Sequence, residues 1–190
     1  AELVEVTGPD PIKAKKRIDQ ALSILKAVGL PREQQNTRSA LTLLALLDVK
    51  PTTPWSKAGN PLRGITPMMD FMRDDFGMEY APNTRETVRR QTVHQFVQAG
   101  LVVLNPDDPR RPTNSPKSVY QIEPEALKAV RTFGTAKWDA MLSQYLATVE
   151  TLASRYAQAR EMERLPVDLG AGKVVALSPG GQNDLIKRIV

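Results

Sequence analysis

The stretch YAPNTRETVRRQTVHQFVQAG, residues 80–100, has the pattern of a single helix with one apolar side. Asn83 is a typical N-cap residue, and Glu86 follows three positions later, as in a capping box. Gly100 is typical of the residue that ends a helix. At about 100° per residue, the apolar side is formed by Val88, Thr92, Phe96 and Ala99, with Val93 and Val97 at its edge. We therefore expect one side of this helix to lie against a core.

The opposite side of this helix is polar but carries a single charged group. It is formed by Thr84, Thr87, Arg90, Gln91, His94 and Gln98. Arginine, glutamine and threonine side chains make directional hydrogen bonds in the major groove of DNA, whereas a face that only meets water more often carries glutamate and lysine. The pattern is compatible with a DNA-recognition helix. A plain solvated helix is an equally good interpretation of this helix taken alone.

A shorter helix is predicted directly before it. Thr66 is its expected N-cap, Pro67 its first residue, and Gly77 lies beyond its end. Its buried side is expected to consist of Met68, Met69, Phe71, Met72 and Phe76. Two helices joined by a tight turn, the second with a polar outer face, form a helix-turn-helix pattern.

Two strands are predicted after the second helix, Leu101–Leu104 and Ser118–Ile122. The loop between them, NPDDPRRPTNSPK, is rich in turn-forming residues and carries Arg110, Arg111 and Lys117. Helix, helix, strand, basic loop, strand is the order of a winged helix, whose loop commonly rests on the phosphate backbone. The three cations of this loop are therefore expected to contact phosphates.

Two further helices are predicted before this motif. The first begins with Asp10 as N-cap and Pro11 at its first position, and it ends at Gly29. Its expected buried stripe is Ile12, Ile18, Leu22, Leu25 and Val28. Its other face carries Lys13, Lys15, Lys16 and Arg17. Such a run either contacts phosphates or, more often, is a solvated face. The second helix, Ser39–Leu47, is apolar nearly all round and is expected to be buried.

Residues 48–65 contain three prolines and two glycines and are expected to form a loop. The loop is long for a compact domain, and long ordered loops are often functional. Trp55 in this loop is expected to cover the core, and stacking on a base is the alternative.

After the second strand, Glu123 and Pro124 are expected to open a helix that ends at Gly134. A much longer helix is predicted over residues 135–164, with an apolar stripe that includes Trp138, Tyr145 and Tyr156. Roughly 28 residues would span about 42 Å, more than so small a domain can cover. We therefore expect this helix to bridge to another domain or to a dimer partner. Packing on the winged domain is the alternative.

The last part of the sequence predicts a hairpin and the start of another helix. The two strands of the hairpin are expected at Leu165–Leu169 and Lys173–Leu177, and the helix is expected to begin at Asn183 or Asp184. Because the sequence stops within this amphipathic pattern, the chain is expected to be a fragment of a longer protein.

Composition limits the available chemistry. The chain has 190 residues and a net charge of +5, which fits a nucleic-acid partner without requiring one. It has no cysteine and one histidine, which excludes disulfides, cysteine-based zinc sites and histidine clusters. It has no apolar run of membrane-spanning length and no signal peptide, so a cytoplasmic protein without membrane contact is expected.

One loose match to a nuclease motif occurs. Pro9-Asp10 and then Asp48-Val49-Lys50 fit the letters of a PD…(D/E)xK metal site. Such a site needs carboxylates that converge on a divalent metal. Asp10 and Asp48 are expected at the ends of two different helices, so we interpret the match as chance. No catalytic and no metal-binding residue is expected in this chain.

The segment TPWSKAGNPLRGITPMMDFMRDDFGMEYAPNTRETVRRQTVHQFVQAGLV, Thr53–Val102, resembles the N-terminal region of the BsuBI/PstI-type restriction endonucleases, as does NPDDPRRPTNSPKSVYQIEPEALK, Asn105–Lys128. The resemblance extends to LSPGGQNDLIKRIV at the end of the chain. It implies a type II enzyme that cleaves duplex DNA at a short palindrome. It also implies an N-terminal helix-turn-helix recognition region and a C-terminal PD-(D/E)xK nuclease domain that uses magnesium. The family's catalytic residues are expected beyond Val190.

We therefore expect a mainly α chain, a winged helix-turn-helix with extra N-terminal helices, a long C-terminal connecting helix and a small β-hairpin. The expected domains are the recognition domain at residues 1–134, the connecting helix at 135–164, and the hairpin with the start of the nuclease domain at 165–190. The expected partners are double-stranded DNA and a second copy of the chain. No cofactor is expected in this chain, and the resemblance implies magnesium for the full-length enzyme.

The expected base-contacting residues are Asn83, Thr84, Arg85, Thr87, Arg90, Gln91 and His94. The expected phosphate-contacting residues are Lys57, Arg63, Arg89, Arg110, Arg111 and Lys117. Two other hypotheses remain: a stand-alone winged-helix transcriptional regulator, and a protein-interaction module whose wing binds a partner chain. Whether this chain alone is an enzyme is left open. The resembling family consists of site-specific deoxyribonucleases, but the catalytic site is expected elsewhere.

Overall fold

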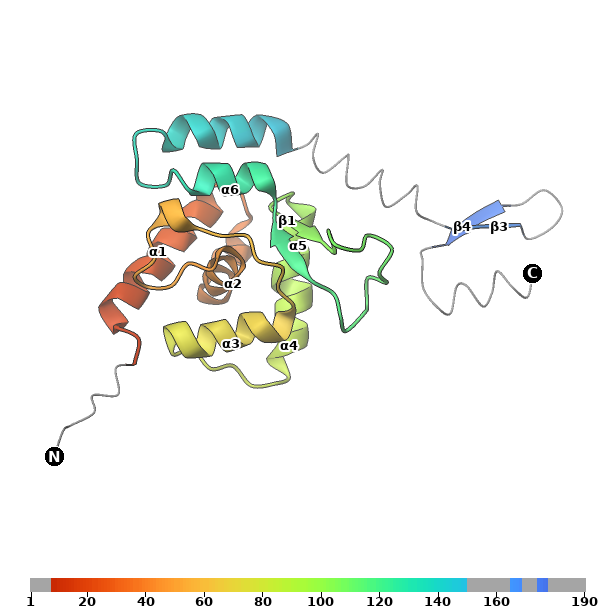
Figure 1. Cartoon of the computed structure of the whole chain (residues 1–190), viewed down its shortest axis with the longest axis horizontal. Coiled ribbons are helices and arrows are strands. Elements are labelled where there is room, and N and C mark those ends of the chain that lie inside the picture. The colour runs from red at the N-terminus through yellow and green to blue at the C-terminus, as the bar shows by residue number, and fades with distance from the viewer. Residues whose placement is uncertain (1–7, 150–164, 169–173, 178–190) are drawn as a thin grey trace.

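A computed structural model describes residues 8–149, 165–168 and 174–177 of the chain (Figure 1). Its α-helices are α1 (Pro11–Ala27), α2 (Thr37–Leu47), α3 (Ile65–Phe76), α4 (Thr84–Thr87), α5 (His94–Gln98) and α6 (Pro124–Val130). A π-helical segment, η3 (Val88–Val93), joins α4 to α5, and two short 3-10 turns are η1 (Arg32–Gln34) and η2 (Trp55–Lys57). Residues 138–149 form a further helix. The strands form two antiparallel pairs, β1 (Val102–Leu104) with β2 (Tyr120–Ile122) and β3 (Leu165–Asp168) with β4 (Val174–Leu177).

Helix α1 begins as the sequence predicts. The Asp10 carboxylate accepts hydrogen bonds from the backbone N–H groups of Ile12 and Lys13 at 3.0 and 3.4 Å. The predicted buried stripe is only partly right, because Ile12 is 81% exposed. The helix packs through Ala14, Ala21, Ile24 and Leu25. Ile12 lies two positions from Ala14, about 200° round the helix, and so points away from the core.

Helix α2 is the centre of the core. Every residue from Ser39 to Leu47 is buried, as expected for a helix that is apolar nearly all round. Helix α1 packs along it, and Figure 1 shows α2 enclosed by its neighbours. Its only residues that are not buried are the first two, Thr37, which is exposed, and Arg38, which is half-buried.

Helix α3 begins two residues earlier than predicted and has a different cap. Gly64 is the N-cap and makes no side-chain hydrogen bond, so the prediction of Thr66 as cap is wrong. The preceding residue, Arg63, pairs with Tyr120 through both backbone groups, at 3.0 and 2.9 Å. This pairing ends a short extended segment at Gly64, and the helix starts there. The predicted stop at Gly77 is confirmed by its φ of 66°.

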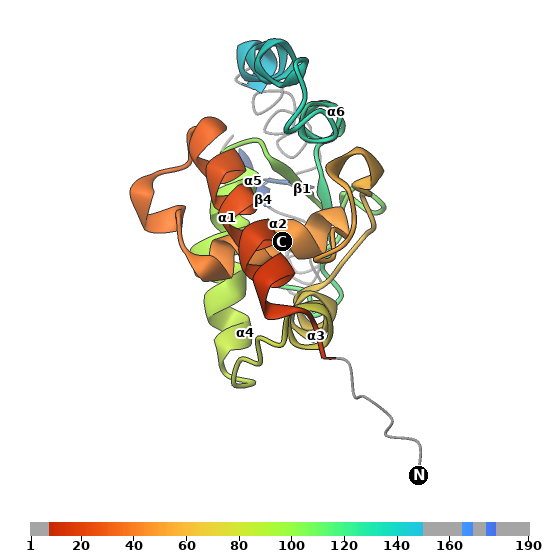
Figure 2. The same ribbon diagram turned by 90° about the vertical axis from the view of Figure 1, so that its left-hand side faces the viewer.

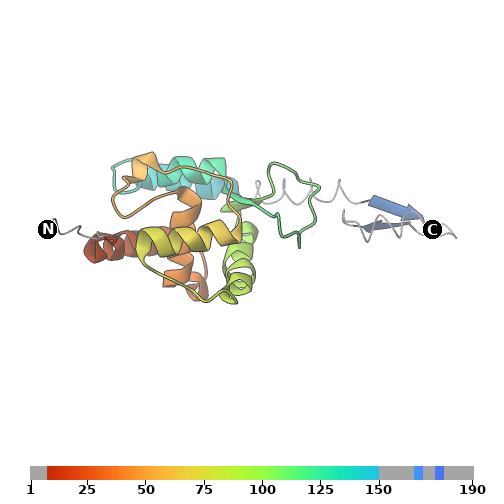
Figure 3. The same ribbon diagram turned by 60° about the horizontal axis from the view of Figure 1, so that its bottom comes forward.

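α4, η3 and α5 form one continuous helix from Thr84 to Gln98, which we call the recognition helix. Gly100 follows it with a φ of 74°, which confirms the predicted end. Strands β1 and β2 come next, with Val102 opposite Ile122 and Leu104 opposite Tyr120. Together with the Arg63 segment, they complete the order of a winged helix, and we call residues 102–122 the wing. Figures 1 and 3 show the wing loop on the same side of the helical body as the recognition helix.

The C-terminal part of the described body is a pair of helices. Glu123 caps α6, its carboxylate accepting from the backbone of Glu125 and Ala126 at 2.8 and 3.0 Å. The next helix starts at residue 138 rather than at 135, after a turn that contains Gly134 at a φ of 78°. Figure 2 shows this helix and α6 stacked at one end of the body, with α3 and α4 at the other.

Three aromatic residues of this region, one buried and two half-buried, are stacked edge to face. The ring of Phe133 lies 5.4 Å from that of Trp55 and 5.1 Å from that of Trp138. Trp55 is buried, and its Nε1 donates to Gln20 of α1 at 3.0 Å. The prediction that Trp55 covers the core is therefore confirmed, and the alternative of base stacking is wrong.

Beyond residue 149 the structure describes only β3 and β4, which confirm the two strands of the predicted hairpin. The predicted remainder of the long helix, including Tyr156, and the predicted final helix lie outside the described residues. The domain boundaries at 134 and 164 stay predictions. No helix among the described residues has the length and apolar composition needed to cross a membrane.

Candidate nucleic-acid interface

The polar side of the recognition helix is on the surface. Asn83, Arg85, Arg90, Gln91 and His94 are exposed, and Thr84 and Thr87 are half-buried. The opposite side is anchored by side chains that are completely buried, Val88, Thr92, Val93 and Phe96. The recognition helix and the residue before it, Asn83, therefore carry all the residues predicted to contact bases, five of them exposed and two half-buried.

The start of the helix differs from the prediction. Asn83 has helical backbone angles and its side chain makes no capping hydrogen bond, so the predicted capping box is wrong. Glu86 instead forms ion pairs with two arginines. Its carboxylate accepts from Arg89 Nε at 2.9 Å and from Arg89 Nη2, and it also accepts from Arg90 Nε. Two guanidinium groups on one carboxylate outweigh the capping bonds that the same carboxylate would otherwise make to neutral backbone.

This ion-pair cluster has a clear electrostatic consequence. The hydrogen bond from Arg89, together with that from Arg90, lowers the pKa of the Glu86 carboxyl to about 2. Glu86 is therefore charged throughout the neutral and mildly acidic range, and it holds both arginines beside each other on the helix surface. The side chain of Arg90 is 72% exposed and that of Arg89 is 32% exposed, so Arg90 is the more accessible to a ligand.

The π-helical segment η3 changes which residues face inward. In a π turn the backbone hydrogen bonds span five residues, and such turns are often found at functional sites. Val93, expected at the edge of the apolar side, is completely buried, and so is Thr92. The wider turn thus brings two consecutive residues to the core and leaves Gln91 exposed directly before them.

Arg38 of α2 contacts this segment and was not predicted. Its Nε donates to Thr92 Oγ1 at 3.2 Å, and its Nη2 donates to Gln91 Oε1 at 3.4 Å. The contact joins residues 54 and 53 positions apart in the sequence. No local pattern at Arg38 indicates it, because the residue reads only as a basic side chain in the first turn of a helix.

The wing carries two kinds of cation. Arg110 and Lys117 are exposed. Arg111 is held inside the loop: its Nη1 donates to Asn105 at 2.9 Å, and its Nη2 donates to Asp107 at 2.7 Å. This ion pair lowers the pKa of the Asp107 carboxyl below its ordinary value. The structure therefore gives Arg111 a part in shaping the loop, whereas Arg110 and Lys117 extend towards solvent, where a ligand can reach them.

Two predicted phosphate contacts, Arg63 and Lys57, belong neither to the recognition helix nor to the wing. Arg63 donates to Asp48 at 2.6 Å and to the carbonyl of Ala45, and its guanidinium lies 4.9 Å from the ring centre of Phe71. These contacts hold α2, α3 and the wing together. Lys57 is exposed on η2, which packs through Trp55 against α1 rather than against the recognition helix. The Arg63 guanidinium is thus occupied within the chain, and the phosphate contact of Lys57 stays a prediction.

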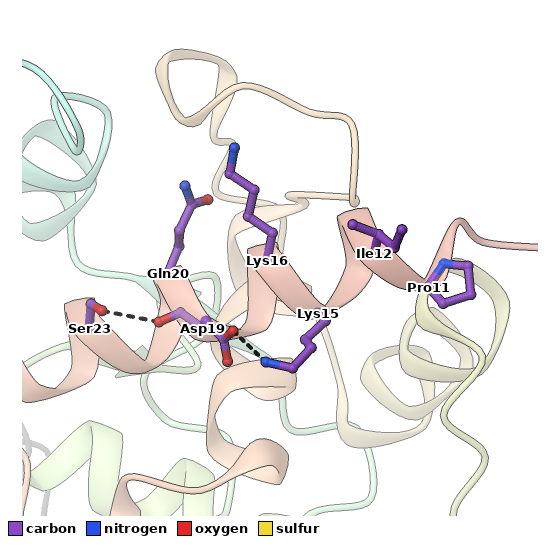
Figure 4. Close-up of a pocket in the computed structure, with 7 residues that line it drawn as sticks. All are labelled: Pro11, Ile12, Lys15, Lys16, Asp19, Gln20 and Ser23. Carbon is purple, nitrogen blue, oxygen red and sulfur yellow. Dashed lines mark hydrogen bonds and ion pairs between the residues drawn. The ribbon is translucent and has the colours of Figure 1, made fainter.

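The basic face of α1 lines a shallow surface hollow (Figure 4). Lys15 forms an ion pair with Asp19 at 2.8 Å, and Lys13 lies 3.9 Å from the Asp10 carboxylate. The guanidinium of Arg17 lies 5.2 Å from the Trp55 ring centre. Three of the four cations of this face thus have a carboxylate or an aromatic ring of the same chain as partner, which fits a solvated face.

Magnesium, which the resemblance implies for the full-length enzyme, does not fit the described residues. Among them, no group of three or more histidine, aspartate or glutamate residues is placed to hold a metal ion. The two aspartates of the loose nuclease match serve other purposes. Asp10 caps α1, and Asp48 follows α2 with a φ of 52° and accepts from Arg63.

Comparison with known proteins identifies the family. Residues 15–154 match the family model described as the BsuBI/PstI restriction endonuclease HTH domain. The chain belongs to the BsuBI/PstI restriction endonuclease family. The matched range runs from α1 past residue 149 and includes the recognition helix and the wing, so the resemblance seen in the sequence is confirmed.

Relatives of this BsuBI/PstI family member are type II restriction enzymes. The chain is 50% identical over 173 residues to the type II restriction enzyme BsuBI of Bacillus subtilis, covering 91% of this chain and 55% of the relative. It is 40% identical over 171 residues to the type II restriction enzyme AplI of Arthrospira platensis, covering 90% of this chain and 52% of the relative. The solved structure of the SdaI restriction endonuclease is similar, with a TM-score of 0.68 and 36% identity over 91% of this chain and 54% of that chain. The chain thus spans about half the length of the relatives it matches.

Proposed function

We propose that this chain is the DNA-recognition part of a type II restriction endonuclease and binds duplex DNA at a specific sequence. The observation that carries the proposal is the exposed polar side of the recognition helix, beside a basic wing, in a chain of the BsuBI/PstI family. The recognition helix would enter the major groove, which admits one α-helix. The wing would rest on the neighbouring phosphates.

The two parts of the surface would then have different tasks. Arg90, Gln91 and the threonines of the helix carry hydrogen-bonding groups suited to base edges. Arg110 and Lys117 carry exposed charges suited to phosphates, whose contacts position the protein but carry no sequence information. The net charge of +5 favours the same partner.

The full-length enzyme would cleave a short palindrome as a two-fold dimer, acting in the cytoplasm where the DNA is. A palindrome has two equivalent half-sites, and a symmetric dimer satisfies both with one type of interface. The nuclease chemistry, with magnesium as its cofactor, would belong to the part of the relatives that this chain does not cover.

The predicted anchors of a dimer contact need correction. Tyr145 is buried within its own chain at 3% exposure, so it is not an interface anchor. Trp138 packs on Phe133 of the same chain. Tyr156 lies outside the described residues. Among the described residues of this helix, Trp138, Met141 and Val149 pack partly on the winged domain, whereas Leu146 is 38% exposed and stays a candidate for the dimer contact.

The proposal is tested by selection of binding sites. The chain is incubated with a library of random duplexes, bound DNA is recovered over several rounds, and the affinity for the enriched sequence is measured between 50 and 200 mM salt, a range over which phosphate contacts weaken binding strongly (about 10³-fold or more for six to ten contacts). We expect one enriched motif and a steep salt dependence. Recovery of unenriched DNA, or an affinity that salt does not change, would reject DNA recognition and favour the protein-interaction hypothesis.

A further inference from the structure

The amide of Gln91 is held in one orientation by Arg38. Arg38 Nη2 lies 3.4 Å from Gln91 Oε1, and Arg38 Nε lies 3.2 Å from Thr92 Oγ1. A guanidinium has hydrogen-bond donors only, so the atom of Gln91 that faces it must be the amide oxygen. The amide nitrogen of Gln91, with its two N–H donors, is therefore left for an external partner.

Arg38 itself is well fixed. It extends from the first turn of α2, whose residues from Ser39 to Leu47 are completely buried. Its second contact, Thr92, is also completely buried and belongs to the π-helical segment. The planar guanidinium thus has one end bonded to a rigid core position and the other to the exposed glutamine. Such a planar group, bonded at two points, resists rotation more than a lysine ammonium does.

A free glutamine in the major groove reads both ends of its amide. It binds adenine with the oxygen accepting from N6 and the nitrogen donating to N7. In this chain the amide oxygen already accepts from Arg38 Nη2, so one of its two lone pairs is used and its orientation is set by α2. The two N–H donors are the groups without a partner among the described residues, so this glutamine acts mainly as a donor.

We propose that Arg38 is a specificity-determining positioning residue, which makes Gln91 present its N–H donors to DNA and so read a base-edge acceptor. This inference rests on the proposed function, in which Gln91 faces the major groove. The acceptors there are N7 and O6 of guanine, N7 of adenine and O4 of thymine. Cytosine offers only the N4 donor at this edge, so we expect Gln91 to discriminate against cytosine on the strand that it contacts.

The test begins with the sequence enriched by the native chain. The base pair that Gln91 contacts is identified as the position at which Gln91→Ala no longer distinguishes the four bases. At that position, each of the four bases is compared, and 7-deazapurine replaces the purine where one is selected. Affinities are measured for the native chain, Arg38→Ala, Arg38→Lys, Gln91→Ala, Gln91→Glu and the double alanine variant. Arg32→Ala, which removes an exposed arginine of the neighbouring turn η1, is the matched control for loss of one charge.

We expect the native chain to bind a duplex with cytosine at this position about tenfold or more weakly than the selected duplex. Arg38→Ala should lose this discrimination at the same base pair only, and the double variant should equal Gln91→Ala, because Arg38 acts through Gln91. Arg38→Lys should recover part of it. Arg32→Ala should keep the full discrimination. Gln91→Glu has acceptors only, so it should bind cytosine better than the native chain does, and this variant leaves Arg38 paired even if Arg38→Ala does not fold.

The outcomes separate the inference from the function on which it rests. If the native chain enriches a motif but Arg38→Ala weakens every sequence equally, Arg38 is a phosphate contact and the inference is wrong while the proposed function stands. The inference is also wrong if the losses of binding free energy in Arg38→Ala and Gln91→Ala add up in the double variant. The same holds if Gln91→Ala changes no base preference, or if Gln91→Glu does not bind the cytosine duplex better than the native chain does. If the native chain enriches no motif, the proposed function fails and the inference fails with it.

Discussion

The hydroxyl of Tyr145 donates a hydrogen bond to the carbonyl oxygen of Gly100 at 3.0 Å, across 45 residues of sequence. Gly100 is the residue that ends the recognition helix, and Tyr145 is buried in the helix of residues 138–149. A Cβ atom at Gly100 would lie 3.2 Å from Cγ2 of Val149, one turn further along that helix. The C-terminal helix is thus packed directly on the end of the recognition helix.

Gly100→Ala is therefore expected to destabilise the chain more than Gly134→Ala. Both glycines have a positive φ, 74° and 78°, so each substitution carries a backbone cost of roughly 1–2 kcal/mol. Only Gly100 has a neighbour within 4 Å of the added Cβ, whereas Gly134 has none among the described residues. Thermal unfolding measures the difference, and Val149→Ala should restore part of the stability of Gly100→Ala. Equal losses for the two glycine variants would contradict the close contact.

Arg90→Ala and Gln91→Ala are each expected to weaken binding to the selected site by about 1–3 kcal/mol and to relax base preference. Both side chains are exposed on the recognition helix. Arg73→Ala is the control, since Arg73 is an exposed arginine of α3 that pairs with Asp70 and Asp74. Titration of specific and random duplexes checks the prediction. Equal weakening on both kinds of DNA would show that this face does not read bases.

The cations of the wing are expected to differ in their effect on salt dependence. Removing Arg110 or Lys117 should lower affinity on all sequences and flatten the salt slope by about one unit each. Arg111→Ala should flatten the slope less, because the charge of Arg111 is balanced by Asp107 at 2.7 Å. Asp107→Asn removes the partner of Arg111 and leaves the arginine charge unbalanced, so this variant should have a steeper salt slope than the native chain. A loss of slope in Arg111→Ala as large as that in Arg110→Ala would assign Arg111 to phosphate after all.

The chain of 190 residues is expected to leave plasmids supercoiled in the presence of magnesium, whereas a chain extended to the length of its relatives should cut at discrete sites. The candidate carboxylates are already used: Asp10 accepts from the backbone of α1, and Asp48 accepts from Arg63. Agarose electrophoresis of a plasmid library distinguishes the outcomes. Site-specific cutting by the short chain that is lost in Asp10→Asn or Asp48→Asn would establish the nuclease match that we interpret as chance.

Much of the fold could be read from short-range patterns. The starts and ends marked by Asp10, Glu123, Gly77 and Gly100 are where they were predicted, because caps depend on groups within a few residues of each other. The apolar periodicity of α2 and of the recognition helix likewise predicted which sides are buried, since burial follows the geometry of the helix itself.

Within the candidate site, the sequence by itself determined which polar residues share the outer side of the recognition helix. Only the tertiary structure decided how those residues are held. Glu86 pairs with arginines instead of capping, Arg111 is tied to Asp107, and Arg38 reaches Gln91 from another helix. The physical reason is that a side chain with several partners within reach takes the one that desolvation and charge favour, and that choice depends on which segments the fold brings together. The 53 positions that separate Arg38 from Gln91 carry no local sign of their contact.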